Sequence, residues 1–231
     1  MRIETIYGNG AAAKAKGLAV VVDVFRAFST ACYIYSRDAQ DILSVDSVDL
    51  AYALKKENPD FILVGERDGS PPPGFDFGNS PLQIKNADLH KKTIVLTTSL
   101  GTQGIVAAQS ADVILTGSFV NAGAIISYIK HLKPKILSLI CTGTTGGSEL
   151  DEDAQCARYI EDSLSGHPGR FEAIFENLKK SRFSGHFFDK NIMSHPEEDF
   201  YLCMALDRFD FVLKSAVDGK GLIHLKKIKA P

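Results

Sequence analysis

Short apolar runs alternate along the chain with segments whose apolar residues recur at helical spacing. Runs of about four to eight apolar residues are typical of strands covered on both faces, as in parallel sheets. The runs predict five strands, at residues 18–24, 61–65, 93–98, 113–117 and 136–141. The segments predict helices at residues 48–58, 102–109, 121–132, 153–164 and 170–181.

The order of these elements indicates the fold class. Strands that alternate with helices form βαβ units and therefore a mostly parallel sheet between two helical layers. At the C-terminal end, residues 211–217 and 222–228 flank Asp218-Gly219-Lys220-Gly221, a pattern typical of an antiparallel hairpin. We predict an α/β fold: a three-layer α/β/α sandwich with a mostly parallel sheet and a C-terminal antiparallel hairpin. A length of 231 residues fits a single domain, with residues 165–231 as an alternative C-terminal subregion.

Composition and charge exclude several classes of protein. With 45% hydrophobic and 23% charged residues, the chain is not intrinsically disordered. A formal net charge of −2 offers no basic field, so neither nucleic acid nor an anionic membrane is expected as a partner. No apolar run reaches the roughly 20 residues that span a bilayer, and the N-terminus does not resemble a signal peptide. The four cysteines form no Cys-x-x-Cys pair, which favours buried, reduced thiols and a cytoplasmic location.

Charged residues follow the first two predicted strands. Asp23 and Arg26 come at the end of the first, and Glu66 and Arg67 follow the second. Ligands of open parallel sheets bind at the carboxyl ends of the strands. A carboxylate in an apolar run is costly to bury unless it is paired or binds a metal, so Asp23 is a candidate functional residue. The alternative is that Asp23 caps a helix starting near Ala27.

Two loops have the composition of an anion-binding site. Hydroxyl groups, glycine and a helix N-terminus come together in Thr98-Ser99-Leu100-Gly101-Thr102 and again in residues 143–148, which start at Gly143. Asp151, Glu152 and Asp153 follow the second loop, and a phosphate beside three acids needs a cation such as Mg²⁺. The alternative role of these acids is to complement a helix dipole. Neither loop matches a Walker A pattern.

Further polar candidates lie at other strand ends and in one unusual loop. Ser118 and Asn121 follow the fourth strand, and residues 74–81 form a Gly/Pro-rich loop that could be an active-site flap supplying Asp76, Asn79 or Ser80. The alternative for this loop is a turn with packed aromatic residues. Arg26 and Arg67 are candidates for binding acidic groups through their planar guanidinium ions. His186 and His195 are expected to be surface or core residues without a catalytic role.

Taken together, these motifs resemble those of the 2-phosphosulfolactate phosphatase family, in the same order and over roughly residues 18–217. The matching blocks are Val22-Asp23-Val24-Phe25-Arg26-Ala27, Gly65-Glu66-Arg67, Gly74-Phe75-Asp76-Phe77-Gly78-Asn79-Ser80-Pro81, Thr97-Thr98-Ser99-Leu100-Gly101-Thr102, Gly117-Ser118-Phe119-Val120-Asn121-Ala122, Glu152-Asp153, and Glu198-Asp199-Phe200-Tyr201-Leu202-Cys203 with Asp207. One position differs: the family commonly has Asn where this chain has Leu100.

The resemblance implies an α/β enzyme, a Mg²⁺-dependent acid phosphatase that hydrolyses 2-phospho-3-sulfolactate to 3-sulfolactate and phosphate. In methanogens this step lies on the route to coenzyme M. We expect Mg²⁺ to be bound by acids drawn from Asp23, Glu66, Asp76, Glu152 and Asp153. The groups expected to act on or bind the small anionic substrate are Arg26, Arg67, Asn79, Thr98, Ser99, Gly101, Thr102, Ser118, Asn121 and Gly143.

Three nucleophiles are compatible with the sequence: a Mg²⁺-activated water, which we place first, then Asp23 as an acyl phosphate, then a Cys141 thiolate. The Cys-x5-Arg phosphatase loop is absent, because position 147 is Gly. A haloacid-dehalogenase-type phosphatase remains an alternative, although its second Asp is replaced here by Phe25. Another is a non-catalytic protein that binds a small phosphorylated acid, although acids at strand ends would repel that ligand. The sequence leaves homo-oligomerisation open.

Overall fold

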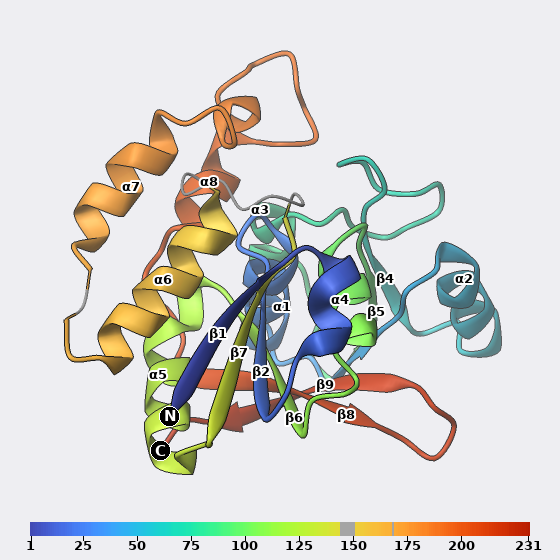
Figure 1. The fold of residues 1–231 in the computed structure, drawn as a ribbon. Coiled ribbons are helices and arrows are strands. Elements are labelled where there is room, and N and C mark those ends of the chain that lie inside the picture. Colours follow the sequence, from blue (N-terminus) through green and yellow to red (C-terminus); the bar gives the residue numbers. More distant parts are fainter. Residues whose placement is uncertain (144–150, 168) are drawn as a thin grey trace.

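One sheet of nine strands runs through residues 1–143, 151–167 and 169–231, the part of the chain that the computed structural model describes (Figure 1). The strands, in chain order, are β1 (Arg2–Tyr7), β2 (Leu18–Val22), β3 (Asp41–Ser44), β4 (Ile62–Gly65), β5 (Thr93–Thr97), β6 (Val113–Gly117), β7 (Ile136–Cys141), β8 (Phe211–Val217) and β9 (Ile223–Lys229). Their order across the sheet is β1-β7-β2-β6-β8-β9-β3-β5-β4.

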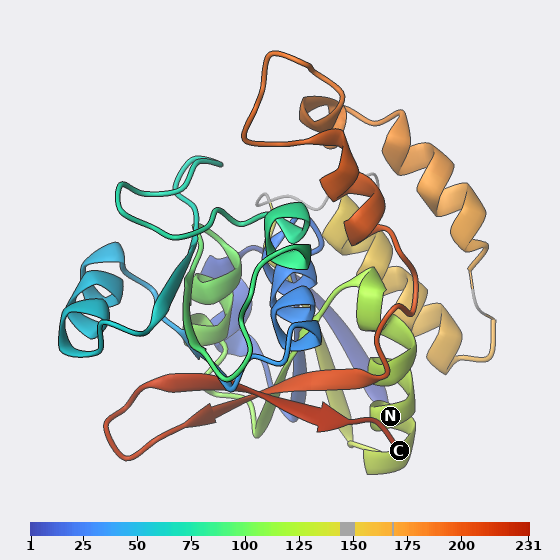
Figure 2. The same ribbon diagram turned by 180° about the vertical axis from the view of Figure 1, so that it is seen from behind.

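The sheet is mostly parallel, and its antiparallel part is the C-terminal hairpin. β1, β7, β2 and β6 pair in parallel, as do β3, β5 and β4. β8 and β9 pair antiparallel with each other and with their outer neighbours β6 and β3. The hairpin therefore lies in the middle of the sheet and joins two parallel halves, as Figure 2 shows. That a separate subregion begins at residue 165 stays a prediction.

Helices cover both faces of the sheet. They are α1 (Ala27–Ser36), α2 (Val48–Glu57), α3 (Pro81–Lys85), α4 (Gly101–Ala107), α5 (Ala122–Leu132), α6 (Glu152–Leu164), α7 (Phe171–Lys179) and α8 (Glu197–Cys203), with short 3-10 helices η1 (Asn9–Lys14), η2 (Phe119–Asn121) and η3 (Gly185–Phe187). One core cluster joins α1, α3 and α4 to one face, and two clusters join α5, α6 and α2 to the other. The predicted three-layer α/β/α sandwich is confirmed.

The apolar run of β2 explains why this strand is central. All five residues are buried, with Ala19 and Val21 in the core on one face and Leu18, Val20 and Val22 in the core on the other. Complete burial of one such side chain stabilises the fold by about 1.5–3 kcal/mol. The sequence pattern missed β1 and β3, because β1 is an edge strand with polar positions and β3 has only two apolar residues, between Asp41 and Ser44.

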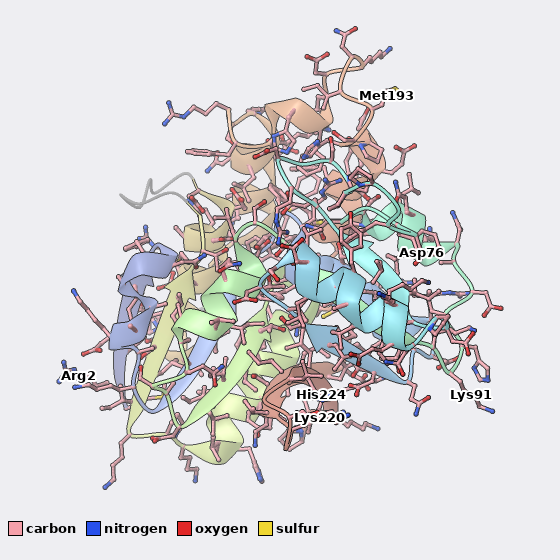
Figure 3. The ribbon with its side chains drawn as sticks, turned by 90° about the vertical axis from the view of Figure 1, so that its right-hand side faces the viewer. Arg2, Asp76, Lys91, Met193, Lys220 and His224 are labelled. Atoms are coloured by element: carbon pink, nitrogen blue, oxygen red, sulfur yellow. The ribbon has the colours of Figure 1, made fainter. Side chains whose placement is uncertain are left out.

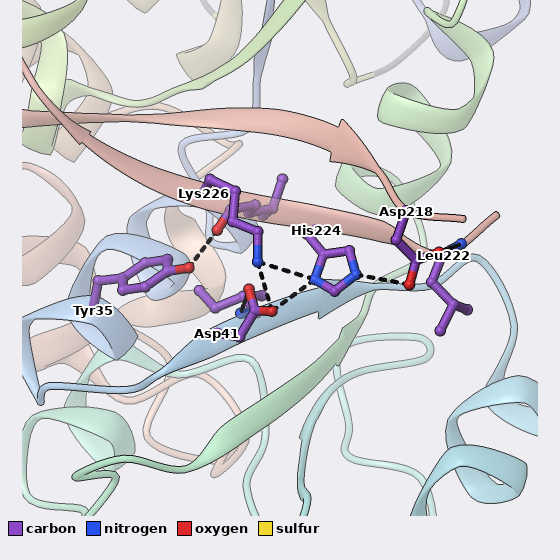
Figure 4. A network of polar contacts seen from close by, with 8 residues as sticks. Tyr35, Asp41, Asp218, Leu222, His224 and Lys226 are labelled. Atoms are coloured by element: carbon purple, nitrogen blue, oxygen red, sulfur yellow. Dashed lines mark hydrogen bonds and ion pairs between the residues drawn. The ribbon is translucent and has the colours of Figure 1, made fainter. Parts of the chain in front are cut away.

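A polar network fastens the hairpin to β3 (Figure 4). His224 of β9 lies between two carboxylates, with its Nδ1 2.7 Å from Asp41 Oδ2 and its Nε2 3.2 Å from Asp218 Oδ2. Lys226 donates to the same Asp41 oxygen at 2.7 Å. Because Asp41 begins β3 and Asp218 begins the hairpin turn, these contacts link the two parts of the sheet.

All four cysteines are buried and unpaired. Within the residues that the structure describes, no helix combines the length and the apolar character that crossing a membrane requires.

Candidate active site

A pocket of about 360 Å³ opens at the carboxyl ends of the parallel strands, where the sequence places most of the candidate residues. Its lining is contributed by the ends of β2, β4 and β5 and by the segment before α8. The lining residues are Asp23, Phe25, Arg26, Glu66, Asp68, Gly69, Asn79, Ser99, Leu100 and His195.

Asp23 follows β2 and is 7% exposed. Its Oδ1 accepts a hydrogen bond from the Ala27 N–H at 2.9 Å, so it fixes the start of α1 while its carboxylate also lines the pocket. Its Oδ2 accepts from the Thr142 hydroxyl at 3.3 Å. Burial is the main cause that raises the pKa of Asp23 to about 6, and the charge of Glu66 adds to the rise although the Ala27 hydrogen bond opposes it.

Asp153 lies beside Asp23 and shares a hydrogen-bond donor with it. The Thr142 hydroxyl that contacts Asp23 lies 3.2 Å from Asp153 Oδ2, and Asp153 also accepts from the N–H groups of Val24 and Gly143 at 2.8 and 3.1 Å. One hydroxyl carries one proton, so it can donate to only one of the two carboxylates at a time. Burial, followed by the charges of Glu152 and Asp23, raises the pKa of Asp153 well above its usual value.

Two more acids stand at the start of α6. Asp151 caps the helix by accepting from the N–H groups of Asp153 and Ala154, and one carboxylate oxygen from each of Asp151, Glu152 and Asp153 lies within 4.8 Å of the others. Burial and the charge of Asp151 raise the pKa of Glu152 to about 8. In the described ranges, no Lys, Arg or His forms an ion pair with these acids or with Asp23.

We call Asp151, Glu152 and Asp153, together with the neighbouring Asp23, the acid cluster. The ligand atoms of the first three lie within 4.8 Å of one another, and Asp23 is joined to Asp153 through the Thr142 hydroxyl. The cluster has the donor chemistry of a magnesium site. Its ligand atoms are carboxylate oxygens only, which Mg²⁺ prefers. Burial and the charges of the neighbouring acids raise the pKa values of Asp23, Glu152 and Asp153, and a bound cation would favour their ionised forms. The residues therefore fit a divalent cation. Asp151, one of the three acids that follow the second predicted anion loop, was not among the expected metal ligands, although its position directly before Glu152 was a usable signal.

Glu66 has a different environment. Its two carboxylate oxygens accept from the Ser99 N–H at 2.7 Å, the Ser99 hydroxyl at 3.1 Å and the Gly69 N–H at 2.9 Å. The carboxylate thus ties the loop after β4 to the loop after β5. The structure brings Glu66 to the pocket wall, but with its charge already bound by protein donors.

Arg26 is held by a buried ion pair that the sequence did not identify. Its Nη1 donates to Asp199 Oδ2 and to the Ser194 carbonyl, both at 2.8 Å. The other oxygen of Asp199 accepts from the Ser80 hydroxyl at 3.0 Å and the Leu82 N–H at 2.8 Å. Asp199 therefore positions Arg26 in the pocket wall and joins α8 to the loop before α3. Its place in the final block of the family resemblance was the available signal.

Arg67 and Asp76, like Glu152 and Asp153, lie outside the pocket lining. The Arg67 guanidinium donates to the Glu66 carbonyl at 2.7 Å, the Thr97 hydroxyl at 2.8 Å and the Asp46 carbonyl at 3.2 Å. Asp76 is exposed (Figure 3), accepts from the Leu63 N–H at 2.7 Å and lies 3.4 Å from Lys55 Nζ. Because Leu63 is in the middle of β4, Asp76 is not brought to the strand end where Glu66 lies.

In the hydroxyl-rich loop after β5, some residues line the pocket and others hydrogen-bond within the loop. Ser99 and Leu100 line the pocket, and Leu100 is 48% exposed. Thr98 and Thr102 instead hydrogen-bond to each other through their hydroxyls and N–H groups. Gly101 must be small, because a Cβ there would lie 2.7 Å from Asp23 Oδ2.

The other predicted binding residues lie deeper or at the edge of the described chain. The hydroxyl of Ser118 is 2.6 Å from the Ser29 hydroxyl, and Asn121 accepts from the Ser118 N–H. Both residues are buried, and neither lines the pocket. Gly143 donates its N–H to Asp153 at 3.1 Å. Residues 144–148 of the second predicted anion loop lie outside the described residues.

Asn79 and His195 complete the pocket. Asn79 is 5% exposed, and its Oδ1 has no hydrogen-bond partner among the described residues. His195 lines the pocket although the sequence indicated no functional position for it. Burial, together with the nearby charge of Arg26, lowers the pKa of His195 to about 3, so its imidazole is neutral at physiological pH. Both side chains can offer hydrogen bonds to a ligand.

Cys141, at the end of β7, is in a poor environment for a thiolate. Its side chain is buried, and burial together with the charge of Asp153 raises the pKa of the thiol far above its usual value. A reactive thiolate requires the opposite, a nearby positive charge or a helix N-terminus.

Comparison with known proteins gives one consistent result. The model of a family described as 2-phosphosulpholactate phosphatase matches residues 7–216. The chain is similar to a probable 2-phosphosulfolactate phosphatase of Bacillus subtilis, with 32% identity over 87% of this chain and 88% of the relative. Proteins with the same description from Thermotoga petrophila and Caldicellulosiruptor saccharolyticus are each 38% identical, over 71% and 78% of this chain and 72% and 74% of their own lengths.

Proposed function

The chain belongs to the 2-phosphosulfolactate phosphatase family and is an enzyme, and we propose that it hydrolyses 2-phospho-3-sulfolactate to 3-sulfolactate and phosphate with the help of Mg²⁺. The observation that carries this proposal is the acid cluster, which reaches the pocket through Asp23 and with which no Lys, Arg or His forms an ion pair in the described part of the chain. A phosphorylated sulfonic acid is multiply negative, so a site lined by carboxylates alone would repel it.

We propose that the cation is held by carboxylates drawn from the acid cluster, with Asp23 on the pocket side. When bound, Mg²⁺ supplies positive charge that neutralises the phosphate and polarises its P–O bonds. Glu66 is better described as a positioning residue, because its oxygens hold Ser99 and Gly69 in place. Membership of the family and the similar proteins support the phosphatase activity, whereas the dependence on Mg²⁺ is proposed from the acid cluster.

In the hydrolysis, a water oxygen forms a bond to phosphorus, the ester P–O bond breaks, and the departing 2-hydroxyl oxygen gains a proton. Asp23 is the acid of the cluster that lines the pocket, so it can accept the proton that the attacking water loses and return it to the departing 2-hydroxyl oxygen. Ser99, Asn79 and the neutral His195 can orient the phosphate and acid oxygens by hydrogen bonds. Phosphoryl transfer depends mainly on such positioning and electrostatics.

An Asp23 acyl phosphate is the second candidate route. Asp23 lines the pocket, and its carboxylate could attack phosphorus directly before water releases the phosphate. Acid quenching during turnover of a ³²P-labelled substrate distinguishes the two routes: the water route leaves no label on the protein, and an acyl phosphate leaves it on Asp23.

The test is a phosphate-release panel with phosphosulfolactate, phospholactate, phosphoglycerate and p-nitrophenyl phosphate, each with Mg²⁺ and with a chelator. We expect the highest kcat/KM for phosphosulfolactate and loss of turnover on chelation. Turnover that survives chelation would remove the metal from the proposal. Tight binding of phosphosulfolactate without any phosphate release would instead identify a binding protein. The buried, unpaired cysteines support the cytoplasmic location that we propose.

A further inference from the structure

A second pocket, of about 450 Å³, lies between the C-terminal ends of α1 and α3 and the segment that follows α8. The three helices pack against one another, as Figure 1 shows. Three cationic side chains line the pocket, Arg37, Lys85 and Arg208, and none of its lining residues is an Asp or Glu. It shares no lining residue with the active pocket, so occupancy of the two can be followed separately.

Cations near helix C-termini often serve only to offset the helix dipole. Each helix end carries roughly −0.5 elementary charge, so three ends contribute about −1.5. Arg37, Lys85 and Arg208 together supply three positive charges. The helix ends therefore neutralise about half of this charge, and the pocket keeps a net positive charge that the dipoles do not explain.

The protein makes little other use of these cations. Arg37 uses its Nε–H to hold the Ala87 carbonyl at 3.1 Å. For Lys85 and Arg208, no side-chain hydrogen bond or ion pair is found within the part of the chain that the structure describes. Both are exposed, so their head groups can move toward a ligand.

The floor of the pocket is fixed, which separates it from an ordinary patch of surface lysines and arginines. Tyr33 is 4% exposed and packs edge-on against Phe209, with ring centroids 5.0 Å apart. Its hydroxyl donates to the Leu202 carbonyl at 3.1 Å. Burial raises the pKa of Tyr33 to about 12, so no negative charge forms on the floor at physiological pH. The Asn86 side chain adds an amide at the rim.

We propose that this second pocket is a binding site for a small anion with two or more negative charges, such as one bearing a phosphate or sulfonate group. Two guanidinium groups and an ammonium group can donate charge-assisted hydrogen bonds to tetrahedral oxyanions, and guanidinium forks do so in bidentate geometry. The site is independent of the acid cluster and of the proposed hydrolysis.

The experiment is a ¹H–¹⁵N NMR titration with inorganic phosphate and, separately, with sulfate. A chelator is present throughout, and sodium chloride keeps the ionic strength constant. The amides of Arg37, Asn86 and Arg208 report on the second pocket, and those of Asn79 and Ser99 report on the active pocket. The variant Lys85→Gln/Arg208→Gln removes two of the cations, and Lys130→Gln/Lys190→Gln removes the same charge from exposed lysines elsewhere.

We expect saturable shifts at the second pocket for the wild type and for the Lys130→Gln/Lys190→Gln control. In Lys85→Gln/Arg208→Gln the affinity should fall about tenfold or more, because two charge-assisted hydrogen bonds are lost. Shifts that never saturate, or equal affinity in all three proteins, would overturn the proposal. The active-pocket amides and phosphate release report on the proposed hydrolysis separately, so failure of one proposal is not confused with failure of the other.

Discussion

Two buried carboxylates at the same end of the sheet, Glu66 and Asp23, have opposite environments. Glu66 accepts three hydrogen bonds from Ser99 and Gly69, so the protein itself compensates its charge. Asp23 accepts one N–H, shares one hydroxyl with Asp153, and has its pKa raised to about 6 by burial and by the charge of Glu66.

This difference separates a structural acid from a functional one. A carboxylate that is saturated with protein donors organises loops and has little need of a ligand. A carboxylate that stays poorly compensated beside other acids destabilises the protein unless a cation binds there. Burial alone does not distinguish Glu66 from Asp23, whereas the number of donors does. Asp153 accepts as many hydrogen bonds as Glu66, and what distinguishes it is the charge of Glu152 and Asp23 beside it.

The largest effect is expected from Asp23→Asn. This substitution should lower kcat/KM for phosphosulfolactate by roughly 1000-fold or more, because the pocket loses the carboxylate that contacts the cation. Steady-state phosphate release measures it. The matched control is Asp76→Asn, whose amide oxygen can still accept the Leu63 N–H outside the pocket and which should remain near wild type. Near wild-type turnover by Asp23→Asn would remove this residue from the chemistry.

The same two carboxylates should respond oppositely to neutralisation when stability is measured at pH 7.5 with chelator. In Glu66→Gln the amide must face an N–H of Ser99 or Gly69, which should destabilise the fold by about 1–3 kcal/mol. In Asp23→Asn the amide can face the Thr142 hydroxyl and the buried charge is gone, so stability should rise by about 1–3 kcal/mol. Urea unfolding measures both, and equal signs would contradict the comparison.

The gain of Asp23→Asn should depend on pH. Because the pKa of Asp23 is raised in the folded state, the folded protein holds a proton that the unfolded chain releases, and wild-type stability is lost as pH rises from about 4 through about 6. The stability difference between Asp23→Asn and wild type in chelator should therefore be small near pH 4.5 and reach its full size above pH 7. Unfolding midpoints across this range measure it, and a difference that does not change with pH would show that Asp23 titrates normally.

The smallest effect is expected from Leu100→Asn, which introduces the residue that the family commonly has. Leu100 is 48% exposed, so the free energy of unfolding should change by no more than about 0.5 kcal/mol. An added hydrogen bond to the substrate should lower KM for phosphosulfolactate by roughly two- to tenfold. Kinetics with phosphosulfolactate and phospholactate measure it, and unchanged KM for both would remove Leu100 from substrate selection.

Much of the fold could be predicted from the sequence, because long apolar runs such as β7 and the hairpin strand β8 carry their own signal. β1 and β3 could not, since their stability comes from neighbours that are distant in sequence. The position of the hairpin in the middle of the sheet likewise depends on pairing between distant strands, which no local sequence pattern specifies.

The sequence predicted which strand ends form the candidate site, but not which way the side chains at those ends point. Because Asp23 and Glu66 follow parallel strands, the sequence predicted that they meet, and both line the pocket. It did not indicate that Thr98 and Thr102 hydrogen-bond to each other, or that Asp76 lies beside Lys55. Asp199 was missed because its hydrogen-bond partners Arg26, Ser80 and Leu82 lie more than a hundred residues away in the sequence. His195 was missed because the strand ends with which it lines the pocket are likewise distant along the chain.

The most direct test of the central claim is calorimetric titration of the chelator-treated protein with Mg²⁺. Wild type should bind one Mg²⁺ per chain, Asp23→Asn should bind it at least about tenfold more weakly, and Glu66→Gln should lose less affinity than Asp23→Asn. Absence of saturable Mg²⁺ binding by the wild type, or a larger loss for Glu66→Gln than for Asp23→Asn, would contradict a cation site at the acid cluster.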